Sequence, residues 1–116
     1  MGRVTKLTTC AAAVLALNAG APVAAAEAKS CKPVVNPYEG SRYDGIDLRG
    51  ISARNVSCRT ARLVVREAHY RALEIPPPSS GVRRYRWRTW SVRGDLRGGT
   101  DRYRARSGRK LVTWLF

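Results

Sequence analysis

The sequence predicts an α+β fold in which one helix packs on a small antiparallel sheet of three or four strands. Between Ser57 and the prolines at 76–78, apolar residues recur at helical spacing. Later segments alternate apolar side chains with arginine, as half-buried strands do. A sheet with one apolar face needs a covering layer, and we expect the single helix to provide it.

The first 26 residues have the pattern of a secretory signal peptide. Two basic residues precede an apolar stretch at residues 7–19, and small side chains then allow cleavage after Ala26, or after Ala28 as a second choice. A membrane anchor is the alternative. The apolar run is short for a bilayer, however, and Pro22 interrupts it. We therefore expect an exported protein.

The expected export determines how the cysteines are interpreted. Cys10 would be removed with the signal, which leaves Cys31 and Cys58 as an even pair in an oxidising compartment and predicts one disulfide. The bridge would tie an irregular N-terminal arm at residues 27–45 to a domain at residues 46–116. In the chain-entropy model a loop of about 28 residues contributes roughly 3–4 kcal/mol to stability.

A helix is expected to begin at Ser57, whose hydroxyl can accept a hydrogen bond from an unpaired amide of the first turn. It must end before Pro76. Cys58 belongs to the apolar stripe, so the disulfide would fasten the arm to the core side of the helix. The apolar stripe contains Cys58, Ala61, Val65, Ala68 and Ala72.

Strands are expected in four segments. Within the second segment the apolar residues change parity between Trp87 and Trp90, which suggests a bulge near Thr89. The segments are residues 49–54, 84–93, 101–106 and 109–116.

The last two strands are expected to form a hairpin around Ser107-Gly108. A two-residue turn there would place Arg106 opposite Arg109 and Tyr103 opposite Val112. The same faces follow from the alternation within each strand. The side chains expected to point inward are Tyr103, Ala105, Val112, Trp114 and Phe116.

The chain is strongly basic. Of its 22 Lys and Arg residues two precede residue 27, so 20 basic and 8 acidic residues remain, a net charge of +12. Such a field attracts anionic polymers, including nucleic acid, acidic lipid surfaces and cell-wall polymers. The alternative is compositional, because GC-rich bacterial genomes use arginine and alanine heavily.

The expected sheet would gather arginines on its outward surface. Guanidinium groups bind phosphate bidentately, and an aromatic neighbour adds stacking for sugars or bases. We predict this surface as the candidate anion-binding site. Its residues are Arg84, Arg86, Arg88, Trp90, Arg93, Arg102, Arg104 and Arg106.

The segment at residues 50–65, G-I-S-A-R-N-V-S-C-R-T-A-R-L-V-V, resembles an element of small secreted actinobacterial proteins, in which a short strand leads into a V-S-C-x-x-A helix. The hairpin after Tyr103 is similar to their C-terminal hairpin, which typically carries a second cysteine pair. Ala105 stands where that cysteine would be, so the resemblance implies a secreted domain without the second bridge. It implies no catalytic residues.

Catalytic and metal-binding patterns are weak. His69 is the single histidine and has no Cys or His at ligand spacing, so we expect a partly buried structural role. Asp44 and Asp47 lie beside Arg42 and Arg49, so we expect them to form turns and neutralise charge rather than bind a cation. No serine has a recognisable base partner. We expect no enzyme, no metal and no cofactor.

Two classes of function remain open. The first is a secreted module that binds anionic cell-envelope polymers or acidic proteins, with nucleic acid as a non-specific ligand. The second is a secreted protein-interaction module, inhibitor-like or resembling a cationic toxin, with its specificity in the loop at residues 76–82 or in the N-terminal arm. We expect a monomer without a transmembrane segment in the mature chain.

Overall fold

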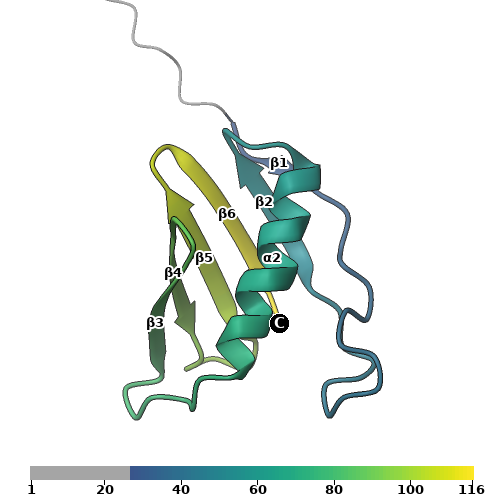
Figure 1. Cartoon of the computed structure of the whole chain (residues 1–116), viewed down its shortest axis with the longest axis vertical. Coiled ribbons are helices and arrows are strands. Elements are labelled where there is room, and N and C mark those ends of the chain that lie inside the picture. Colours follow the sequence, from purple (N-terminus) through teal and green to yellow (C-terminus); the bar gives the residue numbers. More distant parts are fainter. Residues whose placement is uncertain (1–26) are drawn as a thin grey trace, which may run out of the picture.

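The structure, a computed structural model, describes residues 27–116, so the expected signal peptide lies outside the described residues. One helix packs on a six-stranded antiparallel sheet whose strand order is β1-β2-β6-β5-β4-β3 (Figure 1). The strands are β1 (Lys29–Ser30), β2 (Arg49–Arg54), β3 (Val82–Trp87), β4 (Trp90–Asp95), β5 (Arg102–Ser107) and β6 (Lys110–Leu115).

The helix α2 spans Cys58–Leu73 and confirms the expected position. The Ser57 hydroxyl accepts a hydrogen bond from the Thr60 amide at 3.1 Å, which satisfies one of the free donors of the first turn. Its apolar stripe faces the sheet, and Ala61, Val65 and Ala68 are fully buried. Within residues 27–116, no helix has the length and hydropathy needed to cross a bilayer.

The sheet has six strands rather than the expected three or four, mainly because the segment at 84–93 is a hairpin and not one bulged strand. The chain turns at Arg88 and Thr89, and Arg88 has a positive φ of 54°. Trp87 pairs directly with Trp90 across this turn. Cross-strand partners share a face, so residues 87 and 90 both point inward although one number is odd and the other even. A two-residue turn therefore changes the parity of the inward residues just as a bulge would.

The turn of the last hairpin lies one residue later than expected. Ser107 pairs with Lys110, and the turn is Gly108-Arg109, with a φ of 59° at Gly108. Glycine adopts this left-handed conformation without strain, so it takes the first turn position. The register therefore shifts by two residues, which leaves every side chain on its expected face. Tyr103, Ala105, Val112 and Trp114 are buried as expected, and Phe116 packs against them partly buried.

The N-terminal segment is fastened at several points. The predicted disulfide joins Cys31 to Cys58, with 5.4 Å between their Cα atoms. Strand β1 pairs with β2 and supplies the sixth strand. Tyr38, within the segment expected to be irregular, is buried in the core, and its hydroxyl donates to the Arg66 carbonyl oxygen at 3.0 Å.

The core lies wholly between the helix and one face of the sheet, which we call the helix face. His69 lies at the centre of the core and is 0% exposed, so it is more deeply buried than the sequence suggested. Its Nδ1 accepts a hydrogen bond from Trp114 Nε1 at 3.1 Å. Arg83 is also buried there, and its guanidinium donates to the Tyr103 hydroxyl at 2.8 Å and to the Ile75 carbonyl at 2.9 Å.

Candidate anion-binding face

The helix covers only one face of the sheet, and among residues 27–116 no second layer covers the other (Figure 1). We call this second surface the outer face. Six of the seven predicted arginines project from it on three adjacent strands, β3, β4 and β5. They are Arg84, Arg86, Arg93, Arg102, Arg104 and Arg106.

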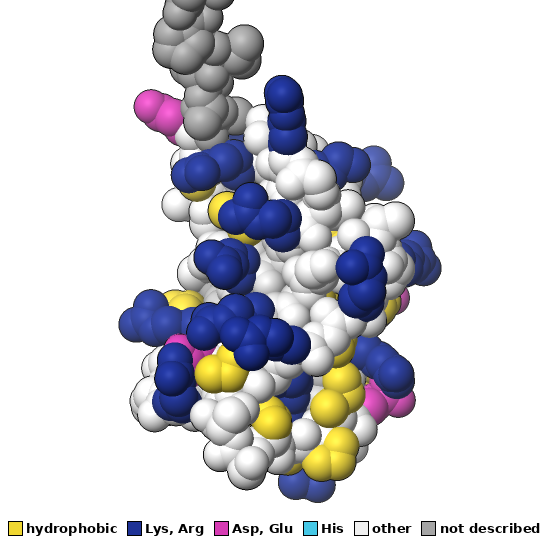
Figure 2. All heavy atoms as spheres, turned by 90° about the vertical axis from the view of Figure 1, so that its left-hand side faces the viewer, with side chains coloured by type: hydrophobic (Ala, Val, Ile, Leu, Met, Phe, Trp, Pro, Cys, Tyr) yellow, Lys and Arg dark blue, Asp and Glu magenta, His cyan; other side chains and the backbone are white. Residues whose placement is uncertain are grey.

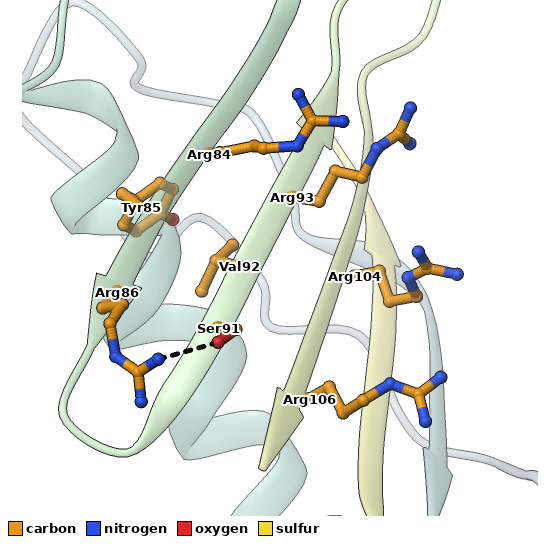
Figure 3. A pocket seen from close by; sticks show the side chains of 8 residues that line it. All are labelled: Arg84, Tyr85, Arg86, Ser91, Val92, Arg93, Arg104 and Arg106. Atoms are coloured by element: carbon orange, nitrogen blue, oxygen red, sulfur yellow. Dashed lines mark hydrogen bonds between the residues drawn. The ribbon is translucent and has the colours of Figure 1, made fainter.

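The antiparallel register sets these arginines side by side. Arg84 pairs with Arg93, and Arg93 pairs with Arg104. Neighbouring strands lie about 4.8 Å apart, so three guanidinium stems stand in one short row. In Figure 3 their side chains extend from the sheet on one side, whereas Tyr85 and Val92 point to the helix.

Two of the predicted residues lie elsewhere. Trp90 is only 7% exposed and belongs to the core on the helix face, where it pairs with Trp87 across the turn. Arg88 occupies that turn, and its guanidinium carbon lies 4.8 Å from the centre of the Trp87 ring. The outer face therefore carries arginines without the expected aromatic partner.

Arg54, which was not among the predicted residues, also belongs to the outer face. It pairs with Leu111, whose partner on β5 is Arg106. A usable signal was present, since Ile51 and Ala53 alternate as inward residues and leave Arg54 on the outward side.

Two shallow hollows lie on the outer face. One, of about 490 Å³, is bordered by arginines of β3, β4 and β5 (Figure 3). The other, of about 410 Å³, continues toward β6 and includes Thr113. Arg93 and Arg104 border both hollows, so the two form one connected depression across the sheet.

Acidic side chains offset little of the positive charge on this face. Among residues 27–116 there are two ion pairs, Arg71–Glu74 and Arg97–Asp95, and neither includes an outer-face arginine. Asp95 stands in β4, but both of its oxygens accept hydrogen bonds from the Arg97 side chain, which lowers the pKa of that carboxyl. The flank beside β3 and β4 accordingly shows many basic and few acidic side chains (Figure 2).

This arrangement suits the binding of anions. Like charges in cross-strand positions repel one another, so a ligand that neutralises them gains more than one bound by a single arginine. Guanidinium groups donate two parallel hydrogen bonds to a phosphate or carboxylate. The face is broad and open, which favours an extended ligand over a small enclosed one.

The other candidate residues have structural roles. His69 is enclosed by aromatic rings, and burial lowers its pKa to about 3, helped by the nearby positive charge of Arg83. Asp44 accepts hydrogen bonds from the Asn36 side chain at 2.9 Å and the Gly40 amide at 3.1 Å, and the first of these chiefly lowers its pKa. Asp47 accepts one from the Asn36 amide at 2.9 Å. Nowhere in residues 27–116 do three metal-ligating side chains meet.

Comparisons with protein-family models, with curated proteins and with solved structures found no match for this chain. The resemblance at residues 50–65 therefore stays a prediction.

Proposed function

We propose that this protein is a secreted, basic binding module that attaches to anionic polymers or surfaces through its outer face, without catalysis. One observation carries the proposal. Six arginines share the uncovered face of the sheet, and none of them forms an ion pair within residues 27–116.

The energetic cost of placing like charges side by side supports a ligand-binding role for this surface. Cross-strand pairs of like charge lower stability, and Arg84, Arg93 and Arg104 form two such pairs in succession. Basic residues also lie on the helix and in the loops. Those of β3, β4 and β5 differ from them because cross-strand pairing holds them side by side, on strands whose other face builds the core.

Export is part of the same proposal. It rests on the signal-like pattern of residues 1–26 and agrees with the disulfide, since oxidising compartments preserve such bonds. A common origin with the small secreted actinobacterial proteins rests only on the motif at residues 50–65.

The test is retention of the oxidised protein, residues 27–116, on heparin and on immobilised nucleic acid as salt is raised. A face variant replaces Arg84, Arg86, Arg102 and Arg104 with Gln. A control variant makes the same change in charge away from this face. It replaces Lys32, Arg42, Arg59 and Arg66, all exposed, with Gln.

We expect the control variant to elute near the wild type and the face variant at much lower salt. The slope of log affinity against log salt should fall by roughly three in the face variant, because each phosphate contact contributes about 0.7–0.9. Equal elution of the two variants would overturn the proposal. The loop at residues 76–82 and the N-terminal arm would then be tested for a protein partner.

A further inference from the structure

One cross-strand row of the outer face places a hydrogen-bond donor on every strand of the sheet. Its members are joined by direct register pairs from one edge of the sheet to the other. We call it the donor row. In order from β3 to β1 it consists of Arg84, Arg93, Arg104, Thr113, Ser52 and Ser30.

The neighbouring rows are not continuous in this way. On one side Leu115 separates Arg102 of β5 from Arg49 of β2. That row continues on β4 and β3 with Asp95 and Val82, which are not donors. On the other side Leu111 interrupts the row between Arg106 and Arg54. Only the donor row offers an unbroken line of donors across the sheet.

The two hollows of the outer face lie along the donor row. The larger hollow is bordered by Arg84, Arg93 and Arg104, and the adjoining hollow by Arg93, Arg104 and Thr113. Five gaps between strands at about 4.8 Å give the row a length of about 24 Å. An extended chain can therefore lie across the strands in contact with successive members.

The donors of this row are free to bind. Within residues 27–116, none of its three guanidinium groups forms an ion pair or a side-chain hydrogen bond, and none of its three hydroxyl groups does. Arg86 in the flanking row, by contrast, already donates to the Ser91 hydroxyl at 3.2 Å.

The strands supply no aromatic side chain to the outer face. Tyr85, Trp87, Trp90, Tyr103 and Trp114 all belong to the core or pack against it on the helix face. Proteins that hold single-stranded nucleic acid stack its bases on aromatic rings. The donor row can bind phosphates but offers nothing for bases.

We propose that a linear, phosphate-bearing polymer without bases lies across the strands along the donor row. The three arginines bind its phosphate oxygens bidentately, and the hydroxyls of Thr113, Ser52 and Ser30 donate to the groups that follow. This inference rests on the proposed function and adds the direction and chemical class of the ligand.

The experiment compares variants of equal charge. The row variant replaces Arg84, Arg93 and Arg104 with Gln. The flank variant replaces Arg86, Arg102 and Arg106 with Gln. A third, uncharged change, Ser52→Ala with Thr113→Val, removes two hydroxyls of the row without altering electrostatics.

Three probes of matched charge are titrated against each protein at fixed salt, with Trp fluorescence or calorimetry as the readout. They are long-chain inorganic polyphosphate, a poly(glycerol phosphate) and single-stranded oligothymidylate. The first two share the proposed chemistry, and the tighter of them identifies the natural source.

We expect the base-free polymers to bind at least as tightly as the oligothymidylate. The row variant should lose about tenfold more affinity than the flank variant, because it removes aligned phosphate contacts. The hydroxyl variant should lose about threefold to tenfold. Equal losses in the row and flank variants would overturn the row while leaving polyanion binding intact. Tenfold tighter binding of the oligothymidylate would overturn the base-free class, and no binding by the wild type would overturn the proposed function as well.

Discussion

Acid is expected to destabilise this domain through one buried side chain, His69. Its Nδ1 accepts the hydrogen bond of Trp114 Nε1, so the neutral ring carries its proton on Nε2. A second proton would occupy Nδ1 and break that bond inside the core. Burial, with Arg83 adding positive charge nearby, accordingly lowers the pKa of His69 from 6.5 to about 3.

The direction and size of the effect follow from linkage. Below about pH 6.5 the unfolded chain binds a proton that the folded protein does not bind until about pH 3, so stability is lost as the pH falls through this window. One pKa unit corresponds to about 1.4 kcal/mol. Between pH 7 and about pH 4 the histidine should therefore lower the free energy of unfolding by about 3 kcal/mol.

Urea unfolding followed by Trp fluorescence at several pH values measures this loss. The matched control is His69→Asn, whose side-chain oxygen can still accept the Trp114 hydrogen bond but does not titrate. Carboxylates with lowered pKa, such as Asp44, weaken both proteins alike in acid. Equal losses of free energy in the wild type and His69→Asn between pH 7 and about pH 4 would refute this role of His69.

Three further perturbations test other parts of the fold. Reducing the disulfide, whose cysteines are 27 residues apart, should lower the free energy of unfolding by roughly 3–4 kcal/mol in urea titrations, and unchanged midpoints would contradict this. Gly94→Ala should lower the melting temperature by several degrees, about 2 kcal/mol, because a Cβ there meets the buried ring of Tyr103. Arg83→Met removes a positive charge near His69 and should raise the pKa of that histidine. NMR can follow this titration, because His69 is the only histidine of the chain, and a lower pKa would contradict the stated cause.

The helix could be predicted because its signals are local. Ser57 as the N-cap, the apolar stripe of α2 and the prolines after it all act within a few residues of one another. The faces of β5 and β6 were also predictable, because alternation determines them separately in each strand. The disulfide followed from pairing the two cysteines that come after the expected signal peptide.

The strand count and the hairpin register could not be obtained in this way. A bulge and a two-residue turn change side-chain parity alike, and Arg88 carries no glycine-like signal for the positive φ it adopts. Strand β1 is only two residues long, and it exists because Cys31 and the pairing with β2 hold it there. These features depend on contacts between distant parts of the chain.

In the candidate site, too, only the features that depend on local alternation could be predicted. Alternation placed six arginines on one face correctly, but Trp90, which was predicted beside them, lies in the core on the helix face. The donor row was beyond sequence reasoning, since Ser30, Ser52 and Thr113 join the arginines only through the pairing of β1, β2 and β6.

The outer face and the core are built from opposite sides of the same strands, which separates binding from folding. Arg84, Arg93 and Arg104 contribute nothing to the packing around Trp114, yet their two like-charge pairs cost a few tenths to about 1 kcal/mol each. Neutralising the row should therefore weaken polymer binding more than neutralising the flank does, and it should raise the melting temperature at low salt, with the gain shrinking as salt screens the repulsion. A surface that merely reflects arginine-rich composition carries the same repulsion without any binding to lose. The row variant distinguishes a binding surface from a compositional one. A gain in stability together with a loss of binding identifies a surface whose arginines lower stability but bind a ligand.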